Sequence, residues 1–178
     1  MALSQDLRAA LTPFDGKATS LLGEAEAAFG RQVAYIEALI TLIGDAGPYV
    51  GSGATWLLKS FLEHGGALSA EQTQTLIAAL PSGDDAHWST QLHLCQSMRY
   101  LDLSGVGASS LRSSSLWLWV EPLLTHKRPF LRAWSLDALA HLAREHKAYQ
   151  ADFEKALQRA SKDEAASVRA RAHRSILD

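Results

Sequence analysis

The sequence has little of what marks a disulfide-bonded, secreted or membrane protein. Its 178 residues include a single cysteine, Cys95, so an internal disulfide is excluded and a reducing compartment is expected. No stretch approaches the roughly 18 apolar residues that a membrane helix needs. The first residues also lack the basic segment and apolar run of a signal peptide. We therefore expect a cytoplasmic protein that does not act in a membrane.

Proline and glycine are also scarce, at 5 and 12 residues. This scarcity argues against a β-rich or disordered chain, and the abundance of Ala and Leu favours helices. Hydrophobic residues make up 47% of the chain and charged residues 20%, an ordinary globular balance. The length suits one domain with a sizeable core. We predict a single domain over 1–178, with a joint in the segment 104–115, which is rich in serine and glycine.

Apolar residues that recur every three or four positions predict about ten helices. Ser69 and Gln72 form a capping-box pattern at the start of one of them. The segment 116–124 alternates like a strand, but Pro122 and the absence of a partner strand favour a kinked helix. The remaining helices are expected near 4–12, 16–29, 33–43, 52–64, 85–101, 128–146, 152–160 and 164–177, with Val33, Ile36, Leu39, Ile40 and Ile43 on the buried face of the third.

One internal match supports a repeat of 37 residues. The segment 131–139, Leu-Arg-x-x-Ser-x-x-Ala-Leu, aligns with 168–176, Val-Arg-x-x-Ala-x-x-Ser-Ile. In each copy the first, fifth, eighth and ninth positions are apolar or small and fall on one helix face. Small residues in the middle of that face let a neighbouring helix approach closely.

At these residues the chain resembles the HEAT-repeat family, whose second helix carries Val-Arg, then Ala, then Ala-Leu at these spacings. Pro122 and the leucines after it are similar to the family's first helix, and Asp163 stands where the family often has an aspartate. The resemblance covers 116–178 well and 51–101 only as helix pairs. It implies an all-α fold, a right-handed superhelical stack of antiparallel helix pairs of the HEAT or armadillo kind.

The resemblance also implies roles for two arginines. In the family, Arg132 and Arg169 would bond carbonyls or acids of the adjoining repeat and so be structural. The alternative is that both contribute to a binding surface, since the residues from 127 onward hold 11 Lys and Arg against 7 Asp and Glu, a net charge of +4. The rest of the chain has a net charge of −6, and the asymmetry is a weak pointer to an anionic partner.

The sequence contains no recognisable catalytic, nucleotide or metal motif. It has no phosphate-binding loop and no nucleophile elbow. Cys95 and His93 are two apart and would point to different sides of a helix, so we expect a buried, inert thiol. His141 and Glu145 share a helix face but fall far short of a metal site. No cofactor and no metal are expected, and an enzyme is not indicated.

The tryptophans are the best candidates for contact residues. Trp56, Trp88 and Trp134 lie on apolar stripes and are expected in the core. Trp117 and Trp119 are two apart and are not expected to be central in one core together. We therefore predict that one of them lines a groove, where a large amphipathic ring is a good anchor.

Three functions remain open from the sequence. The first is a non-enzymatic scaffold or adaptor that binds another protein on a concave helical surface, with Trp117, Trp119, Arg132 and Arg169 as candidate binding residues. The second is a nucleic-acid binder or a DNA repair protein similar to the HEAT-like DNA glycosylases, which use aromatic residues, an aspartate and arginines. Trp134 and Asp137, with Arg169 and Arg171 one repeat later, are similar in kind. The third is a homo-oligomer, or an immunity- or chaperone-like partner of one specific protein. The acidic N-terminal part and the short chain disfavour the second.

Overall fold

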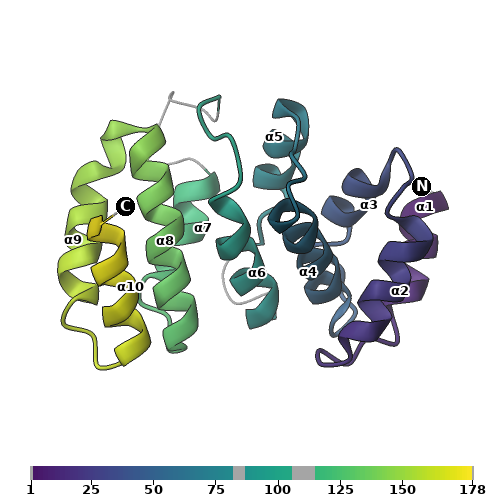
Figure 1. Ribbon diagram of the computed structural model, residues 1–178, viewed down its shortest axis with the longest axis horizontal. Helices are drawn as coiled ribbons and strands as arrows, with labels where there is room; N and C mark the ends of the chain where they lie inside the picture. The colour runs from purple at the N-terminus through teal and green to yellow at the C-terminus, as the bar shows by residue number, and fades with distance from the viewer. Residues whose placement is uncertain (1, 82–86, 106–114, 178) are drawn as a thin grey trace.

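A computed structural model describes residues 2–81, 87–105 and 115–177, without the side chains of Ile176 and Leu177. The regular secondary structure of this part of the chain is all helical, and it contains no strand (Figure 1). Its helices are α1 (Ala2–Leu11), α2 (Thr19–Phe29), α3 (Tyr35–Thr41), α4 (Val50–Glu63), α5 (Ala70–Ala78), α6 (Trp88–Met98), α7 (Ser115–Leu123), α8 (Pro129–Glu145), the 3₁₀ turn η2 (Lys147–Tyr149), α9 (Gln150–Ala160) and α10 (Ala166–Leu177).

Several helix ends follow from local sequence signals. Ser69 and Gln72 form the predicted capping box: the amide of Gln72 donates to Ser69 Oγ at 3.1 Å, and the amide of Ser69 donates to Gln72 Oε1 at 2.9 Å. Pro129 occupies the first turn of α8, where its missing N–H costs nothing. The ambiguous segment is a helix, α7, with Pro122 next to its last residue.

One predicted element is shorter than its apolar pattern indicates. The helix expected from Val33 begins only at Tyr35, because Gly30 ends α2 and turns follow it. Val33 is therefore fully exposed, whereas Leu39 is fully buried. The expected cap at Asp84 or Asp85 and most of the expected joint at 104–115 lie outside the described residues.

The helices α4, α6, α8 and α10 pack side by side in that order, and we call them the second-helix row. Each follows a shorter helix in the chain, and α3, α7 and α9 each contact the member of the row that comes next. A second layer contains α3, α5 and α7, which contact one another in turn. Figure 1 shows the two ends of the chain at opposite ends of this arrangement.

The two copies of the internal match lie on adjacent helices and are buried alike. Leu131 and Val168 are 0% and 1% exposed, and Ser135 and Ala172 are also 0% and 1% exposed. Between them α8 and α10 are in contact, as the small residues predicted. Buried residues from Leu7 to Ala172 form one continuous hydrophobic cluster. No helix in the described ranges has the length and apolar character required to cross a membrane.

Two glycines provide a matched test of this packing. A Cβ on Gly51 would lie 2.5 Å from the carbonyl oxygen of Ile43, because α4 starts against the end of the preceding helix. A Cβ on Gly23, in α2, would have no atom within 4 Å. We expect Gly51→Ala to lower the free energy of unfolding by about 1–3 kcal/mol through overpacking. We expect Gly23→Ala to raise it by about 0.5–1 kcal/mol.

Urea denaturation followed by circular dichroism would measure both changes. A Gly51→Ala protein as stable as the unmodified chain would contradict the close approach of α4 to Ile43.

Candidate ligand-binding face

The two tryptophans of α7 are both buried, at 7% exposure for Trp117 and 4% for Trp119. The expectation that they could not share one core is wrong, because α7 is covered on two sides, by α5 and α8. The exposed apolar side chain of α7 is that of Leu118, at 59%. Trp117 stacks on Tyr149 with ring centroids 5.5 Å apart. Its edge borders a pocket of about 510 Å³ between α7 and α9, which is all that remains of the predicted groove.

The tryptophans that were expected in the core are partly buried, and Trp56 and Trp134 pack against the hydrophobic cluster. Trp56, Trp88 and Trp134 lie on α4, α6 and α8, all in the second-helix row. Two of them are covered by an arginine that comes later in the chain. The Arg128 guanidinium lies 4.7 Å from the ring centre of Trp88, and that of Arg171 lies 3.8 Å from the ring centre of Trp134. These are cation–π contacts of amphipathic rings at a surface.

Arg171 also joins α10 to α8 through a charge pair. Its Nη1 donates to Asp137 Oδ1 at 3.3 Å, and the two side chains are 15% and 14% exposed. The structure thus brings together Trp134, Asp137 and Arg171, three of the four residues considered for nucleic-acid chemistry, whereas the fourth, Arg169, bonds the turn before α10. Their mutual contacts leave the carboxylate neutralised by the arginine and one face of the indole covered.

Arg132 and Arg169 make the same backbone contacts 37 residues apart. Arg132 Nη1 donates to the carbonyls of His126 and Lys127 at 2.9 and 3.3 Å. Arg169 Nη1 donates to the carbonyls of Asp163 and Glu164 at 2.6 and 2.8 Å. Each arginine therefore ties its helix to the turn before it, and not, through these contacts, to the adjoining repeat that the resemblance implies.

Arg132 additionally holds the next helix pair. Its Nε and Nη2 donate to the two oxygens of Asp163 at 2.8 and 2.7 Å, a bidentate pair that lowers the pKa of that carboxyl below its usual range. The group borders a pocket of about 540 Å³ between α8, α9 and α10. Because the donors of Arg132 are taken by the protein itself, we do not assign Arg132 to the ligand-binding face. Arg169 is exposed and its described hydrogen bonds use only Nη1, so its contribution to a binding surface stays a prediction.

We expect Arg132→Met to lower the free energy of unfolding by about 1–3 kcal/mol, because it leaves the largely buried carboxylate of Asp163 without its cation. Arg169→Met is the matched control, because it removes the same pair of carbonyl contacts but breaks no ion pair with a carboxylate. Urea denaturation of both variants measures the difference. Equal losses would refute the assignment of the larger effect to the Arg132–Asp163 pair.

Polar side chains connect α4 and α6. Ser52 Oγ lies 2.6 Å from Ser89 Oγ, which lies 2.7 Å from His87 Nδ1. One turn further on, His93 Nδ1 lies 3.3 Å from Thr55 Oγ1. Burial, with nearby Lys59 acting in the same direction, lowers the pKa of His93 to about 4. His93 is therefore neutral at physiological pH and is held as part of the α4–α6 contact.

The titration of His93 makes stability depend on pH. An unfolded histidine has a pKa near 6.5, so between pH about 6.5 and about 4 the unfolded chain binds a proton that the folded chain does not. The free energy of unfolding should fall by up to roughly 3 kcal/mol as the pH drops through this window, and level off above it.

Urea denaturation at pH 4.5, 5.5, 6.5 and 7.5 would measure this profile. His93→Gln should make it shallower, because glutamine does not titrate. The aspartates with lowered pKa, Asp15, Asp45, Asp102 and Asp163, change stability only near and below pH 4. Burial also lowers the pKa of His87, which contributes to the slope in the same window and accounts for the part that remains. A His93→Gln slope as steep as that of the unmodified chain would contradict the role given to His93.

The other chemically interesting side chains serve the fold. His141 and His146 each donate from Nε2 to a backbone carbonyl, of Leu101 and Leu103, at 2.9 Å, and so anchor that segment to α8. Cys95 is completely buried, as expected, and burial raises the pKa of its thiol. Within the described residues no three His, Cys, Asp or Glu side chains are grouped so as to hold a metal ion.

Sequence reasoning missed an aromatic surface at the N-terminal ends of α4, α6 and α8. Tyr49 meets His87 edge to face at 5.1 Å between ring centres, and His87 lies 5.7 Å from Trp88, which Arg128 covers. Phe130, in the first turn of α8, is 61% exposed. We call these five residues the aromatic edge. Its only sequence signal is that aromatic or basic residues stand at the starts of α4, α6 and α8.

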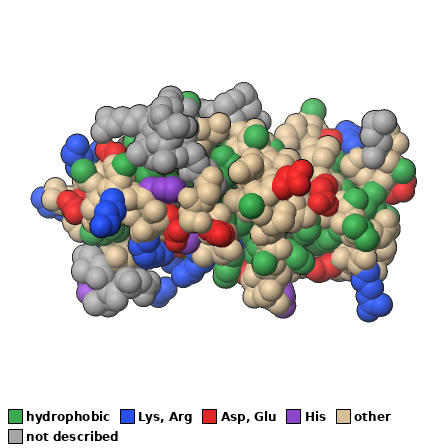
Figure 2. Space-filling view, turned by 90° about the horizontal axis from the view of Figure 1, so that it is seen from above, with side chains coloured by type: hydrophobic (Ala, Val, Ile, Leu, Met, Phe, Trp, Pro, Cys, Tyr) green, Lys and Arg blue, Asp and Glu red, His purple; other side chains and the backbone are tan. Residues whose placement is uncertain are grey.

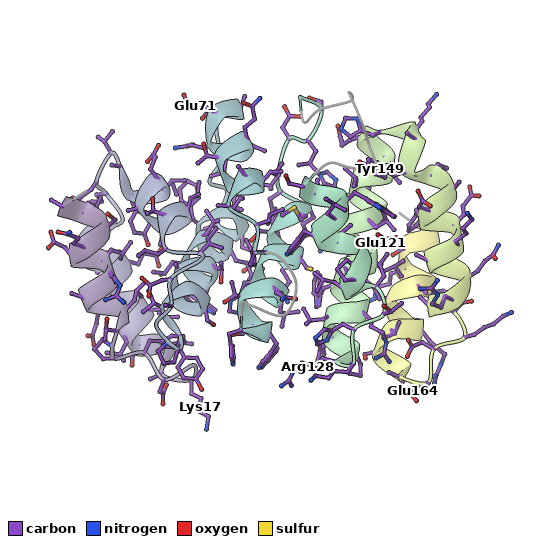
Figure 3. All side chains as sticks on the ribbon, turned by 180° about the vertical axis from the view of Figure 1, so that it is seen from behind. Lys17, Glu71, Glu121, Arg128, Tyr149 and Glu164 are labelled. Atoms are coloured by element: carbon purple, nitrogen blue, oxygen red, sulfur yellow. The ribbon has the colours of Figure 1, made fainter. Side chains whose placement is uncertain are left out.

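Figure 3 places Arg128 and Lys17 along one edge of the molecule and Glu71 at the opposite edge. Figure 2 looks onto the Glu71 side, where most of the visible Lys and Arg side chains lie at the end formed by α8, α9 and α10. The charge asymmetry of the sequence is therefore also an asymmetry in space along the helix row.

Comparisons of this chain with protein-family models, with curated proteins and with solved structures found no match. The candidate residues therefore rest on the geometry described above.

Proposed function

We propose that this chain is a HEAT-like, right-handed superhelical stack that acts as a scaffold or adaptor and binds another protein on its second-helix row, without catalysing a reaction. The observation that carries the proposal is the pair of partly exposed tryptophans, Trp88 and Trp134, each covered by an arginine. Tryptophan and arginine are the residue types most enriched in the energetic centres of protein interfaces.

The packing supports this choice of surface. The members of the row adjoin one another, so their outward side chains form one surface across four helices. The contacts that hold the row together, such as Ser52 with Ser89 and Asp137 with Arg171, lie between adjacent helices. The tryptophans are thus held on a rigid frame, which limits the entropy lost when a partner binds.

Nucleic-acid binding or DNA glycosylase activity is less well supported by the same residues. Asp137 Oδ1 accepts from Arg171 Nη1, and the same arginine covers one face of Trp134, so both side chains are already engaged within the protein. The formal net charge of −2 also provides no general attraction for a polyanion. DNA binding that weakens steeply with added salt would support this alternative instead.

The test is affinity capture from a cell extract with the full chain immobilised, followed by mass spectrometry. We expect at least one protein to be captured by the unmodified chain, with capture reduced at least tenfold by Trp88→Ser, as for an interface hot spot. The matched control is Leu118→Ser, which truncates an exposed apolar side chain on α7, away from the row. Circular dichroism establishes that both variants are folded.

Capture of no protein by the folded chain, or equal loss of the captured protein with Leu118→Ser, would overturn the proposal.

A further inference from the structure

The aromatic edge is continuous and lies open to a partner. Contacts link Tyr49 to His87, His87 to Trp88 and Trp88 to Arg128, and so cross from α4 to α8. None of its five residues is buried, and Phe130 is the largest exposed ring in the described chain apart from Tyr100. Rings that are partly exposed and fixed by their neighbours lose little entropy when they are covered.

Two exposed cations, Lys127 and Arg128, stand at the α8 end of the edge, and neither takes part in an ion pair with a described residue. The described acids nearest in the sequence to Tyr49 and Arg128 are Asp45, which pairs with Arg8, and Glu121, which is exposed and forms no ion pair with Arg128. Asp137, the next acid along α8, pairs with Arg171.

We propose that the aromatic edge binds an acidic segment of the partner protein, in which a carboxylate meets Lys127 and Arg128 and an apolar side chain packs on Trp88 and Phe130. This inference rests on the proposed function and specifies the partner's chemistry. Complementary charge would steer and orient the segment, and the rings would supply the apolar contact.

A peptide fits this surface better than a nucleic acid does. A protein that tracks a phosphate backbone neutralises roughly six to ten phosphates, whereas Lys127 and Arg128 supply two cations that have no ion pair with a described residue. Two cations match one or two carboxylates spaced along a short segment. The exposed Phe130 also calls for an apolar anchor, which an acidic peptide can carry beside its carboxylates.

The experiment is selection from a display library of random 12-residue peptides with the folded full chain as bait. We expect the enriched peptides to hold two or more Asp or Glu together with a bulky apolar residue. A synthetic peptide with the enriched sequence is then titrated by fluorescence polarisation. Arg128→Glu should weaken its binding at least tenfold, and Phe130→Ser at least threefold.

Lys155→Glu is the matched control, since it reverses an equally exposed cation on α9, away from the edge. The affinity of the peptide for this variant should differ less than twofold from its affinity for the unmodified chain. Enrichment of neutral or basic peptides, no enrichment above background, or equal weakening by Lys155→Glu would each overturn the inference. Tighter binding of the oligonucleotide dT20 than of the peptide, weakened to the same extent by Arg128→Glu, would also overturn it.

The two proposals fail separately. If affinity capture finds a partner whose binding depends on Trp88 but not on Arg128, the scaffold function stands and the acidic-segment inference fails. If neither a captured protein nor an enriched peptide is found, both fail.

Discussion

The close packing of α8 on several neighbours is the constraint on which the C-terminal half depends. This helix contacts α6, α7, η2, α9 and α10, and it can do so because alanine and serine occupy much of its buried surface. A small side chain lets two helix backbones approach, and each approach buries apolar area on both partners. The row from α4 to α10 is therefore held by successive helix contacts, and removing one would expose the faces of two others.

Arginine serves two different purposes in this arrangement. Arg132 and Arg169 have the same offsets to their carbonyl acceptors and hold each helix to its preceding turn. Arg128 and Arg171 instead lie over tryptophan rings at the surface of the row. Of these last two, Arg171 is paired with Asp137, whereas Arg128 has no ion pair with a described residue, and the proposed recognition of an acidic segment follows from that difference.

Much of the helical framework could be predicted from particular residues. The capping box at Ser69 and Gln72, Pro129 at the start of α8, and the 37-residue match all correspond to observed features. Burial of Cys95 also followed from its apolar surroundings in the sequence. These signals are local, or compare one helix with another like it, so they do not require knowledge of which helices are neighbours.

The tryptophans mark the limit of that reasoning. Whether an amphipathic ring is buried depends on what lies across from it: α7 is covered on two sides, so Trp117 and Trp119 are both enclosed, whereas Trp88 and Trp134 lie at a surface. The aromatic edge joins residues about 40 positions apart, and no local pattern links them. The sequence by itself determined the helices and the structural arginines, because hydrogen bonds within a helix or to its own turn are set by nearby residues. Only the tertiary structure decided which aromatic side chains are exposed and which cations lack partners, because both depend on contacts between helices that are distant in the chain.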